Sequence, residues 1–213
     1  LKGKLNFITN CKISSITKIQ NKICITAKKN DKENFNEIFD VLVIATGSGT
    51  TELINSNRIM SNFWSKKHSN KKLILNNVIG QMTTIEDTRE TNLFPNFVFC
   101  KGGYITPKIN KKLYSGATYE NCQNEDPYII KKNREKNLRR YLEFVSNENS
   151  IKNISDRRSS RCISLDKLPI VGKINTSRTF ELNNIYSLTA LGSRGFSYAP
   201  LLAELLVKEI LSD

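Results

Sequence analysis

The last fifth of the chain constrains its fold most strongly, because an apolar strand, a glycine-flanked turn and a helix follow one another there. The turn, Gly192 to Gly195, can bring backbone N–H groups against an anionic or carbonyl-rich ligand, since Gly195 has no Cβ to hold the ligand away. We expect the helix to run from about Tyr198 to Leu211, with Pro200 near its first turn, where a missing N–H costs nothing. Apolar residues cover most of its circumference and predict a buried helix: Leu201, Leu202, Leu205, Leu206 and Ile210.

The length and cysteine content of the chain limit its class. A chain of 213 residues can bury a core and form one large or two small domains. It starts at Leu1 and not at Met, so we expect it to be part of a longer reading frame. No apolar run approaches the length of about 18 residues that a membrane span needs. The five cysteines show no CxxC pairing, which predicts no disulfide framework, no zinc site and a reducing, cytoplasmic location.

The chain is strongly basic, with 33 Lys and Arg against 20 Asp and Glu and a formal net charge of +13. One interpretation is an electrostatic surface for nucleic acid. The other is coding bias, since Asn and Ile are also abundant and many lysines are evenly spread. Charge alone leaves both open, because basic runs are often only solvated faces. The clusters are residues 66–67, 71–72, 111–112, 131–132, 134–140 and 157–158.

The amino-terminal part predicts short strands and then one buried strand. Residues 6–9, 12–16 and 22–26 have the pattern of a meander, and residues 30–36 that of a charged loop. Residues 39–45 are almost continuously apolar, as in a strand buried on both faces.

A glycine-containing loop, Thr46-Gly47-Ser48-Gly49, follows this strand at the end where open α/β sheets bind ligands. A dinucleotide fingerprint is not predicted, because Glu52 stands at its third glycine position and would block close packing of helix on strand. The pattern favours a strand-to-helix turn that touches a ligand only through its backbone.

The middle of the chain predicts an α+β unit. An irregular connection over residues 55–72 leads to strands over residues 72–85, 97–106 and 111–118. Asp126 and Pro127 are typical of a helix start, as N-cap and first helical residue. The helix places its apolar residues on one side: Ile130, Leu138, Tyr141, Leu142 and Val145.

Residues typical of acid–base or metal catalysis are scarce. His68 is the only histidine and lies in a Lys-rich stretch, which excludes a histidine triad or a multi-histidine metal site. The sequence also has no Walker-type phosphate loop. We expect Cys100 and Cys162 to be small core residues, because neither has a neighbouring base.

Five motifs in sequence order nevertheless carry a resemblance to a known family. They are Ala45-Thr46-Gly47, Gly80-Gln81, Cys100 to Pro107 (CKGGYITP), Ser115 to Tyr119 (SGATY), and the carboxyl-terminal pair RCISLDKLPIVG from Arg161 and LGSRGFSYAP from Leu191. Together they resemble the carboxyl-terminal part of the FAD-dependent oxidoreductase module of bacterial bifunctional tRNA 5-methylaminomethyl-2-thiouridine biosynthesis proteins. That module belongs to the D-amino-acid-oxidase and glycine-oxidase group, and the resemblance covers about residues 40–210.

The resemblance implies an α/β plus α+β fold. Residues 1–76 would be the remaining part of an incomplete, Rossmann-like FAD-binding domain whose amino-terminal βαβ unit is missing. Residues 77–158 would form an inserted substrate domain built on an antiparallel sheet. Residues 159–213 would return to the FAD-binding domain and end in its carboxyl-terminal helix.

The resemblance also implies site residues. Thr46 and Gly47 would lie beside the adenosine half of FAD, and Gly192, Ser193 and Gly195 would contact the flavin through backbone N–H groups. For the substrate, Arg161 would hold a carboxylate in a bidentate grip, Tyr104 would orient it, and Arg194 would serve either flavin or substrate. No residue is assigned as catalytic, because the flavin itself accepts the hydride.

The resulting hypothesis is an FAD-dependent oxidoreductase of tRNA modification. It would cleave the carboxymethyl group from 5-carboxymethylaminomethyl-(2-thio)uridine at the wobble position, with tRNA and the missing amino-terminal FAD-binding or methyltransferase portion as partners. Two alternatives remain: a glycine- or sarcosine-type amine oxidase, and a non-catalytic basic tRNA-binding remnant. No membrane or metal partner is expected.

Overall fold

The structure is a computed structural model and describes residues 5–30, 33–56, 75–88, 96–120, 126–143, 151–174 and 184–212. The chain forms two compact units. Unit 1 contains Leu1–Asn76 and Cys162–Asp213, and unit 2 contains Asn77–Arg161. No helix within the described ranges is long and apolar enough to cross a membrane.

Unit 1 begins with an antiparallel sheet of three strands in the order β1-β2-β3. The strands are β1 (Cys11–Ile19), β2 (Lys22–Lys29) and β3 (Glu33–Phe39). Alternate residues of β1 and β2 point into the core, where Ile16, Ile23 and Ile25 are buried.

Two expectations for this region are wrong. Residues 6–9 form no strand, and the charged loop expected over residues 30–36 includes the start of β3. β3 pairs with β2 along its whole length, from Glu33 opposite Lys29 to Phe39 opposite Ile23. It is an outer strand, and outer strands tolerate the charged side chains that gave this segment the appearance of a loop.

The second sheet of unit 1 has the order β10-β11-β4. Its strands are β4 (Leu42–Ile44), β10 (Ile170–Lys173) and β11 (Ile185–Thr189), and β4 runs parallel to β11. The expected strand over residues 39–45 is interrupted, because β3 ends at Phe39 and a bend at Asp40 precedes β4. Val43 is 39% exposed, so β4 is not buried on both faces within the described residues.

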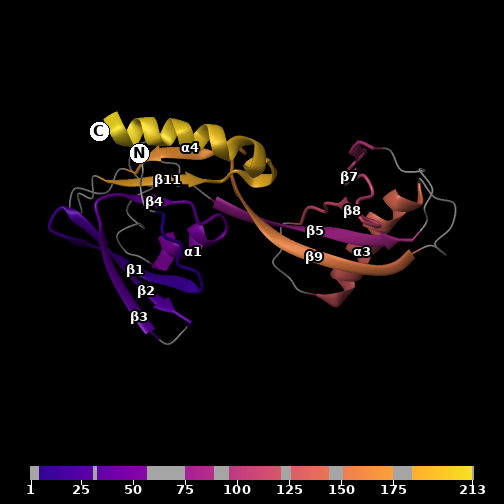
Figure 1. The fold of residues 1–213 in the computed structure, drawn as a ribbon, viewed down its shortest axis with the longest axis horizontal. Coiled ribbons are helices and arrows are strands. Elements are labelled where there is room, and N and C mark those ends of the chain that lie inside the picture. Colours follow the sequence, from indigo (N-terminus) through magenta and orange to yellow (C-terminus); the bar gives the residue numbers. More distant parts are fainter. Residues whose placement is uncertain are drawn as a thin grey trace. The chain divides into compact units, whose positions relative to one another are not determined.

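The described part of unit 1 also contains helical elements. Helix α1 (Gly49–Ser56) follows β4, and the 3₁₀ turn η1 (Gly192–Arg194) leads directly into helix α4 (Gly195–Ser212). Figure 1 shows α4 running along the sheet that contains β11, and α4 contacts both β10 and β11.

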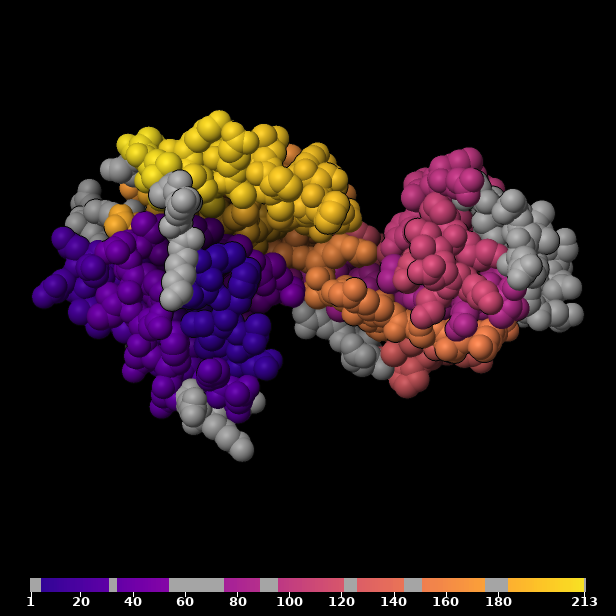
Figure 2. All heavy atoms as spheres, in the orientation of Figure 1, coloured from indigo at the N-terminus to yellow at the C-terminus, as the bar shows by residue number. Residues whose placement is uncertain are grey.

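Helix α4 corrects two predictions. It starts three residues earlier than expected, so Pro200 lies beyond the first turn, where it cannot donate to the carbonyl of Phe196. Only Leu206 is fully buried, while Leu201 is 60% and Leu211 72% exposed. Figure 2 shows α4, in yellow, at the surface of unit 1. The apolar circumference therefore does not mean that the helix is covered by the described part of this chain.

Unit 2 consists of a five-stranded sheet in the order β6-β7-β8-β5-β9, with helix α3 packed on one face. The strands are β5 (Leu75–Asp87), β6 (Phe99–Cys100), β7 (Tyr104–Ile105), β8 (Lys112–Gly116) and β9 (Ile151–Ser164). β5 and β9, which are the two long strands, lie side by side (Figure 1) and each contains a boundary between the units.

Helix α3 (Pro127–Leu142) confirms the predicted start, because the Asp126 carboxylate accepts a hydrogen bond from the Tyr128 N–H at 2.9 Å. Its apolar side packs in a core formed by Ile85, Ile105, Leu113 and Tyr141. Two polar residues of α3, Asn133 and Asn137, are also buried, which the periodicity did not predict. Val145 lies outside the described residues.

Candidate active site

In the sheet of unit 2, the guanidinium group of Arg161 lies over the backbone of Gly80. Gly80 lies on β5 and Arg161 on the neighbouring strand β9. A Cβ at Gly80 would lie 2.1 Å from Nη1, 2.4 Å from Nη2 and 2.5 Å from Cζ of Arg161. The guanidinium group thus lies directly against the Gly80 backbone, and only glycine leaves room for it there.

Arg161 has an unsatisfied donor. Its Nη1 is buried and has no hydrogen-bond partner among the described residues. A buried donor without an acceptor costs about 1–3 kcal/mol, more when the group is charged. The centroid of the Tyr119 ring lies 5.9 Å from Cζ of Arg161, within the range of a cation–π contact. Tyr119 itself is 58% exposed. The Gly80 backbone and the Tyr119 ring thus flank the guanidinium group of Arg161, and its Nη1 has a hydrogen-bond donor without an acceptor among the described residues.

Tyr104 belongs to the same face of the sheet as Gly80. On β5 the residues that face α3 include Gln81 and Thr83, so Gly80 and Met82 point the other way. Tyr104 stands opposite Gly116 in the register of β7 and β8, and the Gly116 backbone lies against Met82. The alternation therefore brings Tyr104 and Arg161 to one face of the sheet, although the two side chains do not contact each other through a hydrogen bond among the described residues.

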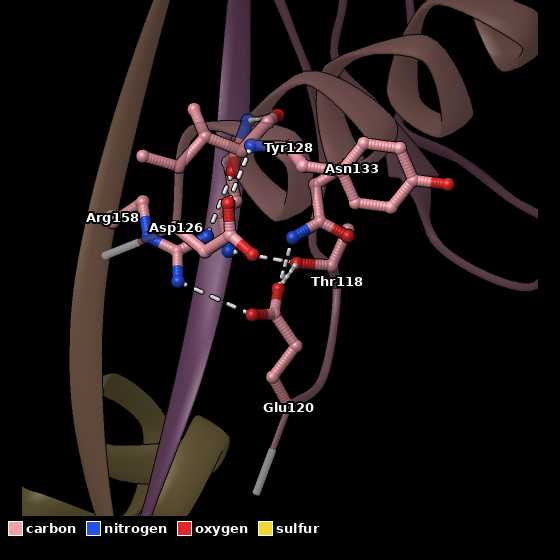
Figure 3. A network of polar contacts seen from close by, with 8 residues as sticks. Thr118, Glu120, Asp126, Tyr128, Asn133 and Arg158 are labelled. Carbon is pink, nitrogen blue, oxygen red and sulfur yellow. Dashed lines mark hydrogen bonds and ion pairs between the residues drawn. The ribbon is translucent and has the colours of Figure 1, made fainter. Parts of the chain in front are cut away.

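A second arginine on β9 provides a contrast to Arg161. Arg158 points to the helix side of the sheet, and both of its terminal nitrogens, Nη1 and Nη2, are bonded there (Figure 3). It donates to Oε1 of Gln81 at 3.0 Å and to Oε2 of Glu120 at 3.2 Å. Glu120 also accepts hydrogen bonds from Thr118, at 3.1 Å, and from Asn133 of α3.

This polar network fixes the strand that carries Gly80. The backbone of Gln81 exchanges two hydrogen bonds with Thr118, and its side chain donates to the Ile130 carbonyl of α3 at 3.0 Å. Residues 80 and 81 are adjacent, so the network on one face determines where the backbone beneath Arg161 lies. Arg158 is thus bonded to Gln81 and Glu120, whereas Nη1 of Arg161 has no hydrogen-bond partner among the described residues.

In unit 1 two loops meet at one edge of a sheet. β4 and β11 are parallel neighbours, so the segments that follow them emerge side by side. Hydroxyl groups join the two segments: Thr50 lies 3.0 Å from Thr46 on one side and 3.0 Å from Thr189 on the other. The predicted residues Thr46 and Gly47 are therefore brought to the same edge as Gly192, Ser193 and Gly195.

The glycines of these loops have different requirements. Gly47 has φ +55° and Gly192 φ +59°, a region that side chains rarely adopt. A Cβ at Gly47 would meet nothing within 4 Å, so this turn faces open space. Gly195 has an ordinary φ of −54°, and a Cβ there would only touch Leu191 at 3.6 Å. The backbone thus requires glycine at 47 and 192 but not at 195.

Arg194 is bound within unit 1. It donates to the Lys167 carbonyl at 2.8 Å and to the Tyr198 hydroxyl at 3.3 Å. The Lys167 turn is closed by Asp166, whose carboxylate accepts from Ser164 at 2.7 Å. This bond, followed by one from a backbone N–H, lowers the pKa of Asp166. The conspicuous Asp-x-Leu-Pro motif is accordingly a turn that Arg194 ties to the start of α4.

The cysteines of the site region divide into two cases. Cys162 is buried, as expected, and burial raises the pKa of its thiol, so it does not act as a thiolate nucleophile. Cys100 is exposed, contrary to the expectation of a core position, because β6 is a two-residue strand at the edge of the sheet. His68 lies outside the described residues.

Comparison with known proteins adds the family. The model of a family described as FAD dependent oxidoreductase matches residues 2–209. The chain belongs to this family. The predicted resemblance is confirmed, and FAD is the cofactor by which the family is named.

Curated relatives of this chain include tRNA 5-methylaminomethyl-2-thiouridine biosynthesis bifunctional proteins. The protein of Pseudoalteromonas atlantica is 32% identical over 139 residues, which cover 54% of this chain and 20% of the relative. That of Vibrio cholerae (strain O395) is 32% identical over 165 residues, which cover 67% of this chain and 24% of the relative. The chain thus spans about a quarter or less of the length of these relatives.

Solved structures show the fold. Glycine oxidase from Bacillus cereus matches with a TM-score of 0.70 and 18% identity, covering 95% of this chain and 50% of that one. Glycine oxidase from Geobacillus kaustophilus matches with a TM-score of 0.69 and 17% identity, covering 95% and 48%. The mixed α/β fold is therefore that of glycine oxidase, and the chain spans about half of each solved structure.

The loops of unit 1 fit a part of FAD. They offer positive-φ glycines and the amino-terminal end of the 18-residue helix α4 at the carboxyl edge of two parallel strands, an arrangement that suits a phosphate- or carbonyl-rich ligand. A cavity of about 230 Å³ opens beside Thr46, lined also by Ile13 and Leu53. Its lining comes mainly from β1 and α1 and does not include Gly47, Gly192 or Gly195.

Sequence reasoning missed Gly80, Tyr119, Gln81, Arg158 and Glu120 as parts of the site. Gly80, Gln81 and Tyr119 lie in motifs of the family resemblance but were assigned no role in the site. An isolated glycine inside a strand pattern is a signal of a close approach, and it could have indicated Gly80. No sequence signal identifies which arginine of β9 is paired, because that depends on which face each side chain takes.

Proposed function

We propose that this chain is part of an FAD-dependent oxidoreductase that removes the carboxymethyl group from 5-carboxymethylaminomethyl-(2-thio)uridine at the wobble position of tRNA. The names of the curated relatives supply the tRNA thiouridine context. FAD, when bound, supplies the two-electron oxidant that turns the C–N bond into an imine, which water hydrolyses to glyoxylate and 5-aminomethyluridine.

One observation carries this proposal: the buried Nη1 of Arg161 lacks an acceptor among the described residues. The substrate is an N-substituted glycine and ends in a carboxylate. A guanidinium group binds a carboxylate through two parallel N–H···O bonds and so fixes both distance and angle. The Gly80 backbone and the Tyr119 ring restrict the movement of this group before the substrate arrives.

Each unit then has its own role in the proposal. In unit 1, the backbone of Thr46, Gly47, Gly192, Ser193 and Gly195 holds FAD, as part of an incomplete Rossmann-like domain. In unit 2, Arg161 binds the substrate carboxylate and Tyr104, on the same face of the sheet, orients it. Arg194 supports the flavin loop through the Lys167 turn and does not contact the substrate.

Helix α4 supports a further part of the proposal. Its exposed apolar residues, among them Phe196 at 100% and Leu201 at 60%, are unusual for a helix of 18 residues that starts at a ligand-binding turn. The solved relatives are about twice as long as this chain. We propose that the remaining amino-terminal portion of the FAD-binding domain covers this side of α4.

Two measurements test the proposed function. A titration of the chain with FAD, followed by flavin fluorescence and the visible spectrum, should show saturable binding. Arg161→Ala should then strongly reduce kcat/KM for glyoxylate release from the carboxymethylaminomethyl substrate and leave FAD binding unchanged. Arg157→Ala is the matched control, because Arg157 is an exposed cation of the same strand. Equal losses in the two variants would contradict the assignment of Arg161.

The alternatives predict different results. A glycine- or sarcosine-type oxidase would turn over sarcosine at least as well as the modified nucleoside. A non-catalytic remnant would bind tRNA and show no spectral change with FAD. Either result would replace the proposed function.

A further inference from the structure

Helix α3 carries a row of cations on its solvent face. The exposed residues recur at intervals of three and four, so they share one side of the helix: Tyr128, Lys131, Lys132, Glu135, Lys136 and Arg139. These residues also line one shallow groove along the helix. We call this side the α3 basic face. It holds four cations and one carboxylate.

The cations of the α3 basic face have no acidic partner among the described residues. Three other cations of unit 2 are paired: Arg134 with Asp156 at 2.6 Å, Arg158 with Glu120 at 3.2 Å and Lys101 with Glu143 at 3.5 Å. Arg134 and Arg140 of the same helix turn toward the sheet and its loops, where they bond to Asp156 and to the Gly102 carbonyl. The α3 basic face therefore carries an excess of positive charge, four cations against the single carboxylate of Glu135.

The other side of α3 restricts what can bind. A basic amphipathic helix can attach to a membrane only if its apolar side is free. Here that side is occupied, because Leu138, Tyr141 and Leu142 pack in the core of unit 2. The α3 basic face consequently acts as a charged surface alone, and its partner is a water-exposed polyanion.

The spacing of the cations matches a phosphate backbone. Lys131 and Arg139 are eight residues apart, which at a rise of 1.5 Å per residue is about 12 Å along the helix. By the phosphate spacing of B-form DNA, about 3.4 Å per strand along the axis, this length corresponds to three to four phosphates, so the row can contact more than one phosphate of an RNA strand. Tyr128, which is 71% exposed, stands at the start of the row and offers a ring on which an unpaired base can stack.

We propose that the α3 basic face binds the phosphate backbone of the tRNA substrate, with Lys131, Lys132, Lys136 and Arg139 as phosphate contacts. This inference rests on the proposed function, because that function supplies tRNA as the polyanion. The α3 basic face would hold the RNA through its charge and not through base-specific contacts.

The test compares two variants of the full chain with the same net charge. In one, the four cations of the α3 basic face are changed to Gln, a residue of similar helix propensity. In the control, the exposed Lys28, Lys29, Lys111 and Lys112 are changed to Gln. The dissociation constant for tRNA is measured over a series of salt concentrations. Far-UV circular dichroism checks that each variant is folded. If the fourfold variant does not fold, the same measurement is made on the double variants Lys131/Lys132→Gln and Lys136/Arg139→Gln.

Each phosphate contact contributes about 0.7–0.9 to the slope of log affinity against log salt, so the fourfold variant should lose about 3 in slope and bind tRNA at least about tenfold more weakly. The control should keep the parent slope. Equal slopes in both variants, or a parent chain that does not bind tRNA, would overturn the inference. Oxidation of the free modified nucleoside by the flavin-loaded protein reports separately on the proposed function, and loss of the α3 cations should leave it unchanged.

Discussion

Replacing Gly80 by Ala should disable the proposed carboxylate site without touching Arg161 itself. The added Cβ would lie 2.1–2.5 Å from three atoms of the guanidinium group, whereas non-bonded atoms prefer about 3.5 Å or more. The group must therefore move by about 1 Å or more. A misplacement of about 1 Å at a positioning group costs about 100-fold in rate, equivalent to about 2.7 kcal/mol.

The assay is kcat/KM for glyoxylate release by the flavin-loaded protein, with thermal unfolding as a check on the fold. The effect of Gly80→Ala should depend on Arg161, because the clash is with that side chain. A double-mutant cycle with Arg161→Ala should therefore be strongly non-additive, with Gly80→Ala costing little in the Arg161→Ala background. Undiminished kcat/KM in Gly80→Ala, or additive losses in the double variant, would refute the geometry on which the site rests.

Three further predictions concern stability. Arg158→Ala leaves Glu120 as an unpaired carboxylate in a largely buried site and should cost about 3 kcal/mol in urea unfolding, while Arg158→Lys should cost less. Asp126→Ala removes the N-cap of α3 and should cost about 1 kcal/mol in the same measurement. The hydrogen bond from the Ser164 hydroxyl is the main cause that lowers the pKa of Asp166. The ionised Asp166 therefore contributes fully to stability above its unfolded-state pKa, and this contribution is lost as the pH falls through the folded-state pKa. Asp166→Asn should accordingly reduce the loss of stability on acidification, measured as the free energy of unfolding against pH.

Local chemistry could be predicted where it depends on neighbours in the sequence. The start of α3 is set by Asp126 and Pro127, whose effects act within one turn, and the structure has the cap as expected. The family was likewise indicated by motifs in order, and the family model matches nearly the whole chain.

Features that depend on distant partners could not be predicted. The apolar pattern of α4 shows that the helix can be buried but not by what, and in this chain Leu201 and Leu205 remain exposed. The charged composition of β3 suggested a loop because pairing with β2 is not visible in the local sequence.

The site itself shows the same limit. Arg158 and Arg161 look alike in the sequence, yet Arg158 bonds to Gln81 and Glu120 while Nη1 of Arg161 has no partner among the described residues. Three positions along a strand put the two side chains on opposite faces. Which of the two arginines lies on the Gly80 side of the sheet depends on how β9 pairs with β5, and this pairing is not visible in the local sequence.

The most direct test of the account is an anaerobic titration of the flavin-loaded protein with tRNA that carries 5-carboxymethylaminomethyluridine. If the proposed function holds, the visible flavin band bleaches with one glyoxylate released per flavin, and Arg161→Ala keeps the band under the same conditions. A bound flavin that stays oxidised in the presence of excess modified tRNA would contradict the proposed function.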